Sequence, residues 1–269
     1  MDVGTAIDLP TDKILARSGE GIGWITFNQP EKRNAISLSM WQGVTAAAQA
    51  FGADDSVRVV VLSGAGGKAF ASGADISEFE KSRSDAAAEE QYHRVGAAAR
   101  KALLGMDKPL IAMVQGYCVG GGCAISLLCD MRIATPESRF GIPAARLGVA
   151  YATESLARLM ALVGPSVAKD IMFTGRLLPA DEALASGLVN QVVAPEALEA
   201  TVTAIARQIA ANAPLTIRHA RTALNMLAGD TVRDDARLDV LYRACFDSAD
   251  FAEGRTAFMA KRKPVFRGA

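Results

Sequence analysis

The sequence has little histidine, no excess of either charge and no long apolar run. Only His93 and His219 occur in 269 residues, and no Cys-x-x-Cys spacing is present, so we expect no metal site. Lysine plus arginine and aspartate plus glutamate number 29 each, which predicts neither nucleic-acid binding nor attraction to an anionic membrane. Because about 18 uncharged apolar residues never follow one another, we also expect no membrane-spanning helix.

The N-terminus lacks the features of a secretory signal. Residues 1–10 contain Asp2 and Asp8 and no apolar stretch of the required length, which predicts a soluble, cytoplasmic protein. The four cysteines lie within apolar stretches, as is typical of buried, reduced thiols.

Apolar residues make up 50% of the chain, enough for a large core. Strand patterns over residues 23–27, 57–62 and 110–114 each precede a glycine-bearing loop and a helical pattern, which indicates an α/β fold. A helix is predicted over residues 38–51, with Ser37 as its N-cap.

Beyond residue 154 the periodicity becomes almost entirely helical, apart from a strand pattern over residues 188–193. We therefore predict an α/β core over residues 1–195 and a helical C-terminal region over residues 196–269, without a low-complexity linker. The helices expected in this part cover residues 155–163, 166–173, 180–185, 196–211, 216–228 and 231–246.

Two glycine-rich loops follow predicted strands. In the first, residues 64–75, Lys68 is followed by Ala69 where a phosphate-binding loop needs Ser or Thr. Its glycines can instead turn the backbone so that an N–H faces a ligand. The second loop, residues 116–130, opens an apolar helix whose first-turn N–H groups, near Gly121, lack intrahelical acceptors. Close packing of helix on strand explains the second loop equally well.

The two loops together resemble those of the crotonase (enoyl-CoA hydratase/isomerase) superfamily. Residues 28–35 are similar to its N-terminal signature, residues 70–75 to its first oxyanion-hole segment and residues 116–130 to its second. Further landmarks follow in the expected order at residues 140–143, 173–175, 183–189, 212–215 and 253–264.

This resemblance implies a spiral of repeated ββα units forming two roughly perpendicular sheets, with C-terminal helices that mediate a homotrimer or a dimer of trimers. It also implies an acyl-CoA thioester as the substrate, with coenzyme A as part of that substrate and no separate cofactor. Ala74 and Gly121 match the two backbone donors that hold the thioester oxygen while an enolate forms. Such an enzyme is a lyase or isomerase of fatty acid metabolism.

Two positions depart from the hydratase pattern. The glutamates that position and deprotonate water in the family correspond to Ala124 and Ala144, and a methyl group cannot transfer a proton. Hydration is therefore in doubt, and isomerisation loses its base at Ala144.

One alternative is decarboxylation of a malonyl-type thioester, because residues 147–151 resemble a stretch of methylmalonyl-CoA decarboxylases. The others are a non-catalytic acyl-CoA binder and RNA binding, which the few basic residues of the helix predicted over residues 84–104 hardly support.

Tyr151 and Glu154 are the candidates for side-chain chemistry in this loop. A phenol can donate a proton to a carbanion, although Tyr151 is as readily explained as a packing aromatic. Glu154 precedes a predicted helix, where a carboxylate favours the helix dipole without any catalytic role.

The resemblance also suggests residues that bind coenzyme A. Lys32 and Arg33 are expected to flank its nucleotide, and Lys261 to approach the phosphates from a neighbouring subunit. Ala71 is expected to be a further coenzyme A-binding residue. The basic end of a C-terminal helix explains Lys261 equally well.

Overall fold

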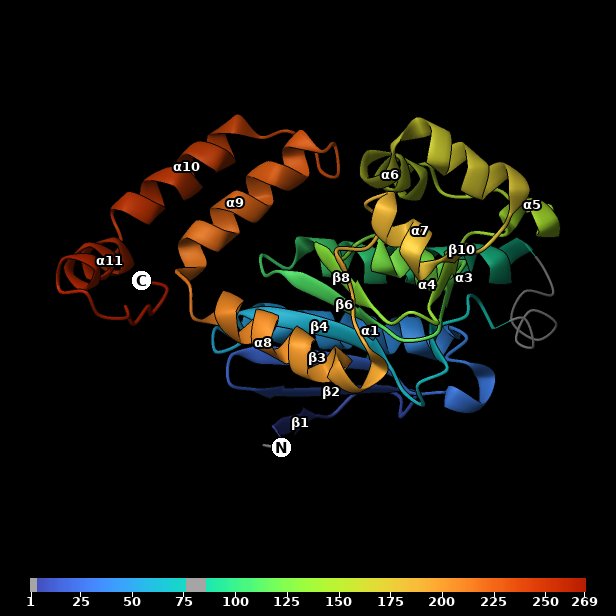
Figure 1. Cartoon of the computed structure of the whole chain (residues 1–269), viewed down its shortest axis with the longest axis horizontal. Helices are drawn as coiled ribbons and strands as arrows, with labels where there is room; N and C mark the ends of the chain where they lie inside the picture. The colour runs from blue at the N-terminus through green and yellow to red at the C-terminus, as the bar shows by residue number, and fades with distance from the viewer. Residues whose placement is uncertain (1–3, 76–85) are drawn as a thin grey trace.

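The computed structural model describes residues 4–75 and 86–269, which form a mixed α/β fold with two sheets (Figure 1). The larger sheet has the strand order β1-β2-β3-β4-β6-β8-β11. Its strands are β1 (Thr5–Ile7), β2 (Ile14–Gly19), β3 (Ile22–Phe27), β4 (Val59–Gly64), β6 (Leu110–Val114), β8 (Met131–Ala134) and β11 (Gln191–Val192). The smaller sheet has the order β10-β9-β7-β5, with β10 (Leu178–Pro179), β9 (Arg139–Gly141), β7 (Tyr117–Val119) and β5 (Ala69–Ala71).

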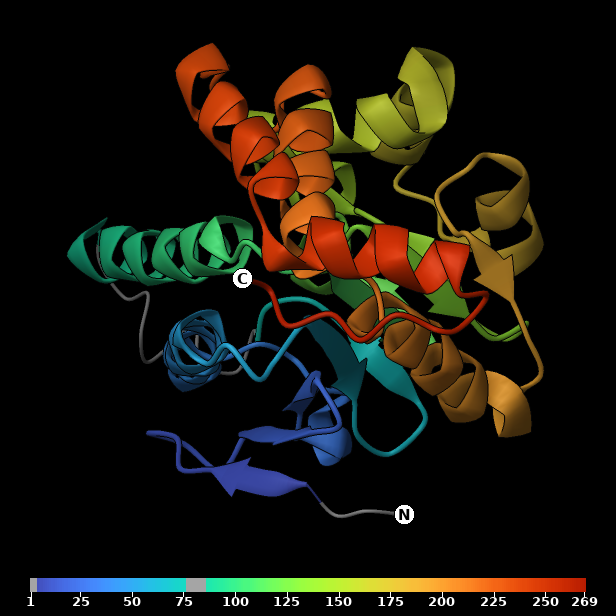
Figure 2. The ribbon, with the colours of Figure 1, turned by 90° about the vertical axis from the view of Figure 1, so that its left-hand side faces the viewer.

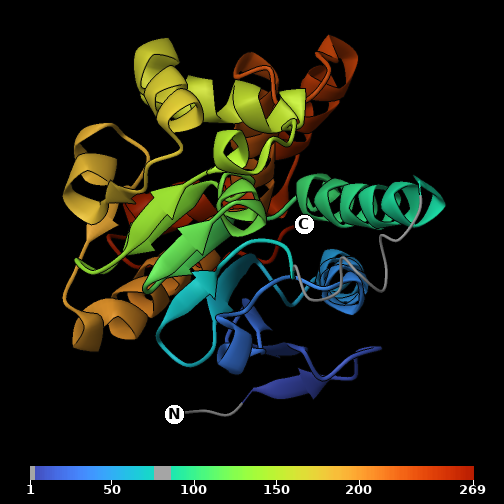
Figure 3. The same ribbon diagram turned by 90° about the vertical axis from the view of Figure 1, so that its right-hand side faces the viewer.

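Helices cover both faces of the larger sheet, with α1 (Leu38–Ala53) on one face and α8 (Leu198–Ala210) on the other. The further helices up to residue 185 are η1 (Pro30–Lys32), α3 (Ala86–Gly105), α4 (Gly121–Ser126), α5 (Ala144–Leu147), α6 (Thr153–Thr174) and α7 (Ala180–Ala185). The C-terminal part contains η3 (Pro195–Ala197), α8 (Leu198–Ala210), α9 (Pro214–Leu227), α10 (Asp235–Phe246) and α11 (Ala249–Met259). α1 and α3 pack side by side (Figure 3).

Strand β4 shows how the core is divided. Its side chains alternate between two apolar clusters, as the period of two in a strand requires. Val60 and Leu62 join the cluster that contains the inner residues of α1, α3 and the smaller sheet, whereas Val59 and Val61 pack against α8. The first glycine loop follows the end of β4 and leads directly into β5, the edge strand of the smaller sheet.

Several predicted elements agree with the structure. Residues 110–114 form β6, residues 180–185 form α7, and α1 begins after Ser37, whose hydroxyl accepts a hydrogen bond from Met40 N. The two helices expected over residues 155–163 and 166–173 are the halves of α6, which is kinked at Gly164 with φ 75° and ψ 165°.

Other predictions need correction. The strand expected over residues 188–193 is only the two-residue β11, and the helix expected from residue 231 begins at Asp235, because Asp234 accepts a hydrogen bond from Arg237 N as its N-cap. The short strands β5, β7 and β9 carry no periodicity that the sequence could reveal. Residues 84 and 85 of the helix expected over residues 84–104 lie outside the described residues.

The C-terminal helices α9, α10 and α11 stand away from the sheets (Figures 1 and 2). They expose large apolar side chains at Leu224, Leu227, Phe246, Phe258 and Met259. Within the described residues, no helix is long and apolar enough to cross a membrane.

Candidate active site

The first loop presents Ala74 beside the segment that enters α1. Ile36 and Ala74 form an isolated parallel bridge, in which Ile36 N donates to Gly73 O at 2.7 Å and Asp75 N donates to Ile36 O at 3.1 Å. Because neighbouring N–H groups of an extended segment point in opposite directions, the N–H of Ala74 faces away from Ile36. It donates to no acceptor within residues 4–75 and 86–269.

The second loop presents Gly121 as the first residue of α4. Gly120 has φ 53° and ψ −120°, a backbone conformation that side-chain-bearing residues avoid. The first hydrogen bond of α4 runs from Ala124 N to Gly120 O at 2.9 Å. The N–H of Gly121 therefore has no intrahelical acceptor, and it finds none elsewhere in the described part of the chain.

Close approach of the two loops brings these donors together. A β-carbon placed on Gly122 would lie 2.2 Å from Ala71 O, so only glycine allows α4 to approach β5 this closely. A β-carbon on Gly121 would lie 3.9 Å from Ala74 N, and one on Gly73 would lie 4.0 Å from Gly121 N. The two nitrogen atoms therefore lie on neighbouring stretches of backbone, and neither N–H has an acceptor among the described residues. Two such N–H groups that converge can bind one oxygen atom as negative charge develops on it.

Asn34 fixes the position of the first loop, and the sequence did not point to it. Its side-chain amide is fully buried, donates to Ala65 O at 3.0 Å and Ala69 O at 2.8 Å, and accepts from Gln29 N at 2.9 Å. Its φ of 56° is left-handed, a conformation that asparagine tolerates better than most residues. An asparagine among charged residues before a predicted helix was the only available signal.

The two alanines that replace the family glutamates are both buried. Ala124 lies in the first turn of α4 and is 9% exposed, and Ala144 opens α5 and is 5% exposed. Neither position supplies a group that can accept or donate a proton.

Tyr151 lies in the loop between α5 and α6, and its side chain packs against the core. Its hydroxyl donates to Gly120 O at 2.7 Å. Burial raises the pKa of this phenol well above its ordinary value, so Tyr151 keeps its proton at neutral pH. The structure thus brings this predicted residue to the second glycine loop.

A protein-family model described as enoyl-CoA hydratase/isomerase matches residues 17–269. The chain belongs to the enoyl-CoA hydratase/isomerase family. Among curated relatives, the short-chain-enoyl-CoA hydratase of Clostridium acetobutylicum is 36% identical over 251 residues, covering 93% of this chain and 95% of the relative. The crotonyl-CoA hydratase of Syntrophomonas wolfei is 34% identical over 258 residues, with 95% and 98% covered.

Solved structures agree with this membership of the enoyl-CoA hydratase/isomerase family. The crystal structure of an enoyl-CoA hydratase/carnithine racemase from Magnetospirillum magneticum has a TM-score of 0.91 and 40% identity, with 97% of each chain covered. Family membership makes the protein an enoyl-CoA hydratase-like enzyme with the expected α/β fold.

The second side-chain candidate is Glu154. It lies not before its helix, as expected, but in the first turn of α6, with an exposed side chain. It lines a cavity of about 460 Å³ together with Arg100 and Arg158. A catalytic role for Glu154 stays a prediction.

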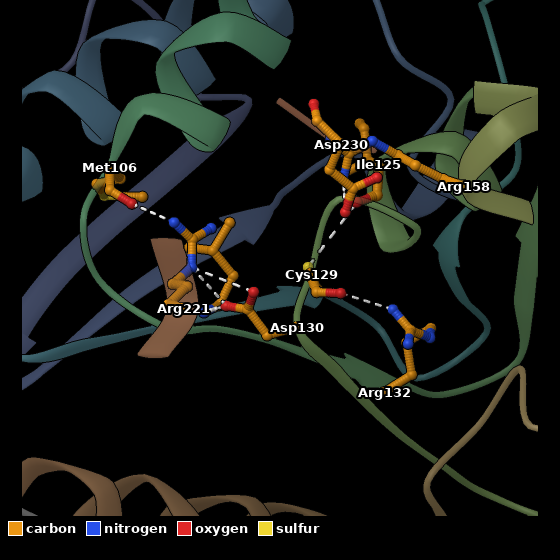
Figure 4. Close-up of polar contacts among 9 residues, drawn as sticks. Met106, Ile125, Cys129, Asp130, Arg132, Arg158, Arg221 and Asp230 are labelled. Carbon is orange, nitrogen blue, oxygen red and sulfur yellow. Dashed lines mark hydrogen bonds and ion pairs between the residues drawn. The ribbon is translucent and has the colours of Figure 1, made fainter. Parts of the chain in front are cut away.

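Buried ion pairs next to this cavity attach the C-terminal helices to the core (Figure 4). Arg221 of α9 donates to Asp130, with a shortest distance of 2.9 Å, and to Met106 O. Arg158 of α6 pairs with Asp230 at 3.2 Å. These contacts fix the orientation of α9 relative to the sheets.

Arg132 of β8 supports the far end of α4. Its guanidinium is 1% exposed and donates to Ser126 O, Cys129 O and Leu188 O at 2.6 to 3.0 Å. Burial lowers its pKa. A lone arginine within an apolar strand was the sequence signal for such a buried cation.

The residues expected to bind coenzyme A are divided between two ends of the molecule. Lys32 pairs with the buried Asp75 at 2.8 Å, and the guanidinium of Arg33 lies 5.2 Å from the ring centre of Tyr117. Ala71 is buried at the end of β5. Lys261 follows α11, which lies at the opposite end of the molecule from α5 (Figure 1).

No cluster of potential metal ligands occurs among the described residues. The cysteines are free: Cys118, Cys123 and Cys129 are buried, and Cys245 is half-buried.

Proposed function

We propose that the protein binds an acyl-CoA thioester and stabilises its enolate with the N–H groups of Ala74 and Gly121. The observation that carries this proposal is the convergence of two unpaired main-chain donors, with Ala74 N 3.9 Å from where a Gly121 β-carbon would lie. Such donors are worth about 3 to 4 kcal/mol each when charge builds on a thioester oxygen.

The enolate is formed without either family glutamate. Both positions are buried alanines. Ala124 and Ala144 therefore cannot remove an α-proton from the substrate or activate a water molecule. The names of the relatives favour an enoyl-CoA substrate, whereas the loss of both carboxylates argues against simple hydration.

Decarboxylation of a malonyl-type acyl-CoA is the second candidate. The bond between the α-carbon and the carboxylate breaks, carbon dioxide leaves, and the electron pair remains as the enolate that Ala74 and Gly121 stabilise. The α-carbon then takes a proton from solvent. This reaction needs no general base, which matches the two buried methyl groups, and Tyr151 lies beside the donors as this alternative requires.

A non-catalytic acyl-CoA binder is less well supported. Binding alone does not need donors that strengthen as charge develops, yet neither donor has an acceptor within residues 4–75 and 86–269.

Coenzyme A recognition and assembly belong to the same proposal. Lys32 and Arg33 carry exposed positive charge near the first loop and suit the nucleotide phosphates, with Ala71 beside the thioester arm. Lys261 of the same chain follows a helix at the far end, so it would act from a neighbouring subunit. The exposed apolar side chains of α9 to α11 support a homotrimer or a dimer of trimers.

Purified protein should be incubated separately with crotonyl-CoA and methylmalonyl-CoA, and the products followed by mass spectrometry. We expect crotonyl-CoA to remain unhydrated, or to react far below the ~1 to 10³ per second typical of enzymes. Loss of carbon dioxide from methylmalonyl-CoA would support the second candidate. Hydration at an ordinary enzymatic rate would show that the alanines do not matter.

The double variant Ala124→Glu plus Ala144→Glu tests the same argument in reverse. A gain of crotonyl-CoA hydration would show that only the two carboxylates are missing. If no hydration appears in a folded variant, the remaining pocket also excludes water.

A further inference from the structure

The hydrogen bond of Tyr151 ends on a peptide group that is central to the proposed oxyanion hole. Its hydroxyl lies 2.7 Å from Gly120 O. The carbonyl of Gly120 and the N–H of Gly121 belong to one peptide unit, which is planar and rigid. A bond that fixes the direction of this carbonyl therefore also fixes the direction of the Gly121 N–H.

One main-chain hydrogen bond also restrains the carbonyl of this peptide unit. Gly120 has no side chain, and its φ of 53° with ψ of −120° lies in a region that glycine enters and leaves cheaply. The bond from Ala124 N to Gly120 O holds the carbonyl along the helix, and the phenol holds it from a second direction. Two donors on one carbonyl also polarise the attached N–H, because hydrogen bonds in a chain strengthen one another.

We propose that Tyr151 is a positioning residue, which aims and polarises the Gly121 N–H through the carbonyl of Gly120 rather than exchanging a proton with the substrate. This inference rests on the proposed function, because it assumes that Gly121 donates to the thioester oxygen. The phenol proton is already used in the bond to Gly120.

The test is isotope-edited infrared spectroscopy of acetyl-CoA labelled with ¹³C at the thioester carbon. Hydrogen bonds to a carbonyl oxygen lower its stretching frequency, so binding to the wild-type protein should shift the band downward. In Tyr151→Phe we expect a large part of that shift to be lost, while the affinity for acetyl-CoA changes less than about threefold. Tyr242→Phe, which removes a hydroxyl from the exposed helix α10, should leave the band unchanged.

The outcomes separate this inference from the proposed function. If wild-type protein binds acetyl-CoA without any band shift, the proposal that Ala74 and Gly121 form an oxyanion hole is wrong. If the wild-type protein shifts the band and Tyr151→Phe shifts it equally, the oxyanion hole is supported but the positioning role of Tyr151 is overturned.

Two tyrosine analogues at position 151 keep the test decisive if Tyr151→Phe folds poorly. p-Fluorophenylalanine fills the volume of the hydroxyl but cannot donate, so it should lose the shift. p-Aminophenylalanine places a donor at the same point and should restore it. Equal shifts with both analogues would contradict the proposal.

Turnover gives a second readout with whichever of crotonyl-CoA and methylmalonyl-CoA reacts. Complete removal of an oxyanion donor costs 10²- to 10³-fold, so a misaligned donor should lower kcat of Tyr151→Phe about tenfold. KM should change little, because the bond acts mainly as charge develops. A fall of 10⁴-fold or more would instead indicate that Tyr151 transfers a proton.

Discussion

The two loops that supply the candidate donors are held in place by different means. Main-chain hydrogen bonds lie on both sides of Ala74, since Gly73 O accepts from Ile36 N and Asp75 N donates to Ile36 O. The carbonyl before Gly121 accepts from Ala124 N and also from the hydroxyl of Tyr151, which lies 31 residues further along the chain. The first donor is thus fixed by the backbone, and the second is fixed by the backbone and a side chain.

This difference matters for how the site tolerates substitution. Main-chain bonds survive most side-chain changes, whereas a bond to a phenol is lost when one residue changes. We therefore expect the first donor to be sensitive to the packing that holds its loop, and the second to be sensitive to individual side chains. Substitutions at three positions test this contrast.

The largest effect is expected on stability, from Arg132→Met near the second loop. The change removes three hydrogen bonds and leaves the carbonyl oxygens of Leu188 and Cys129 without a donor, whereas Ser126 O still accepts from Cys129 N. Each unsatisfied buried acceptor costs about 1 to 3 kcal/mol. Urea denaturation should show a loss of about 3 kcal/mol or more. Arg139→Met, at a partly exposed arginine of β9, is the control and should cost about 0.5 kcal/mol or less. A loss below about 1 kcal/mol for Arg132→Met would contradict its supporting role.

Gly121→Ala should separate activity from stability. Gly121 begins a helix, and the added methyl would have ordinary contacts, 3.7 Å from Ile36 Cδ1 and 3.9 Å from Ala74 N. The fold should be retained, but the methyl would occupy the space between the two donors. We expect kcat/KM to fall about 100-fold, with the melting temperature unchanged or higher.

The control for this variant is Gly105→Ala, because a β-carbon at Gly105 meets nothing within 4 Å. It should leave kcat/KM unchanged, with the melting temperature unchanged or higher because Gly105 ends helix α3. Full activity in Gly121→Ala would mean that the thioester oxygen binds elsewhere.

Asn34 holds the first loop, and its substitution should lower the free energy of unfolding by a smaller amount. Asn34→Gly removes three side-chain hydrogen bonds but accepts the left-handed backbone, and should cost about 2 kcal/mol. Asn34→Ala should cost about 1 kcal/mol more, because its β-carbon disfavours φ of 56°. Equal free energies of unfolding for the two variants would show that backbone conformation contributes nothing at this position.

Long periodic elements were predictable because local patterns determine them. α1 follows its N-cap at Ser37, and β6 and α7 begin and end where their apolar patterns do. β5, β7 and β9 have three residues each, too few for a pattern, and they form strands because distant partners pair with them. The kink at Gly164 likewise depends on one residue that the periodicity of α6 does not reveal.

The sequence alone determined which groups are available at the candidate site. It showed two glycine loops able to expose N–H groups, and it showed alanine at positions 124 and 144, where no carboxylate can act. Only the tertiary structure decided which residues meet. Tyr151 reaches Gly120, Glu154 lines a cavity with Arg100 and Arg158, and Lys261 follows a helix at the far end. The physical reason is that residue chemistry is local, but a contact over tens of residues depends on how strands and helices pack.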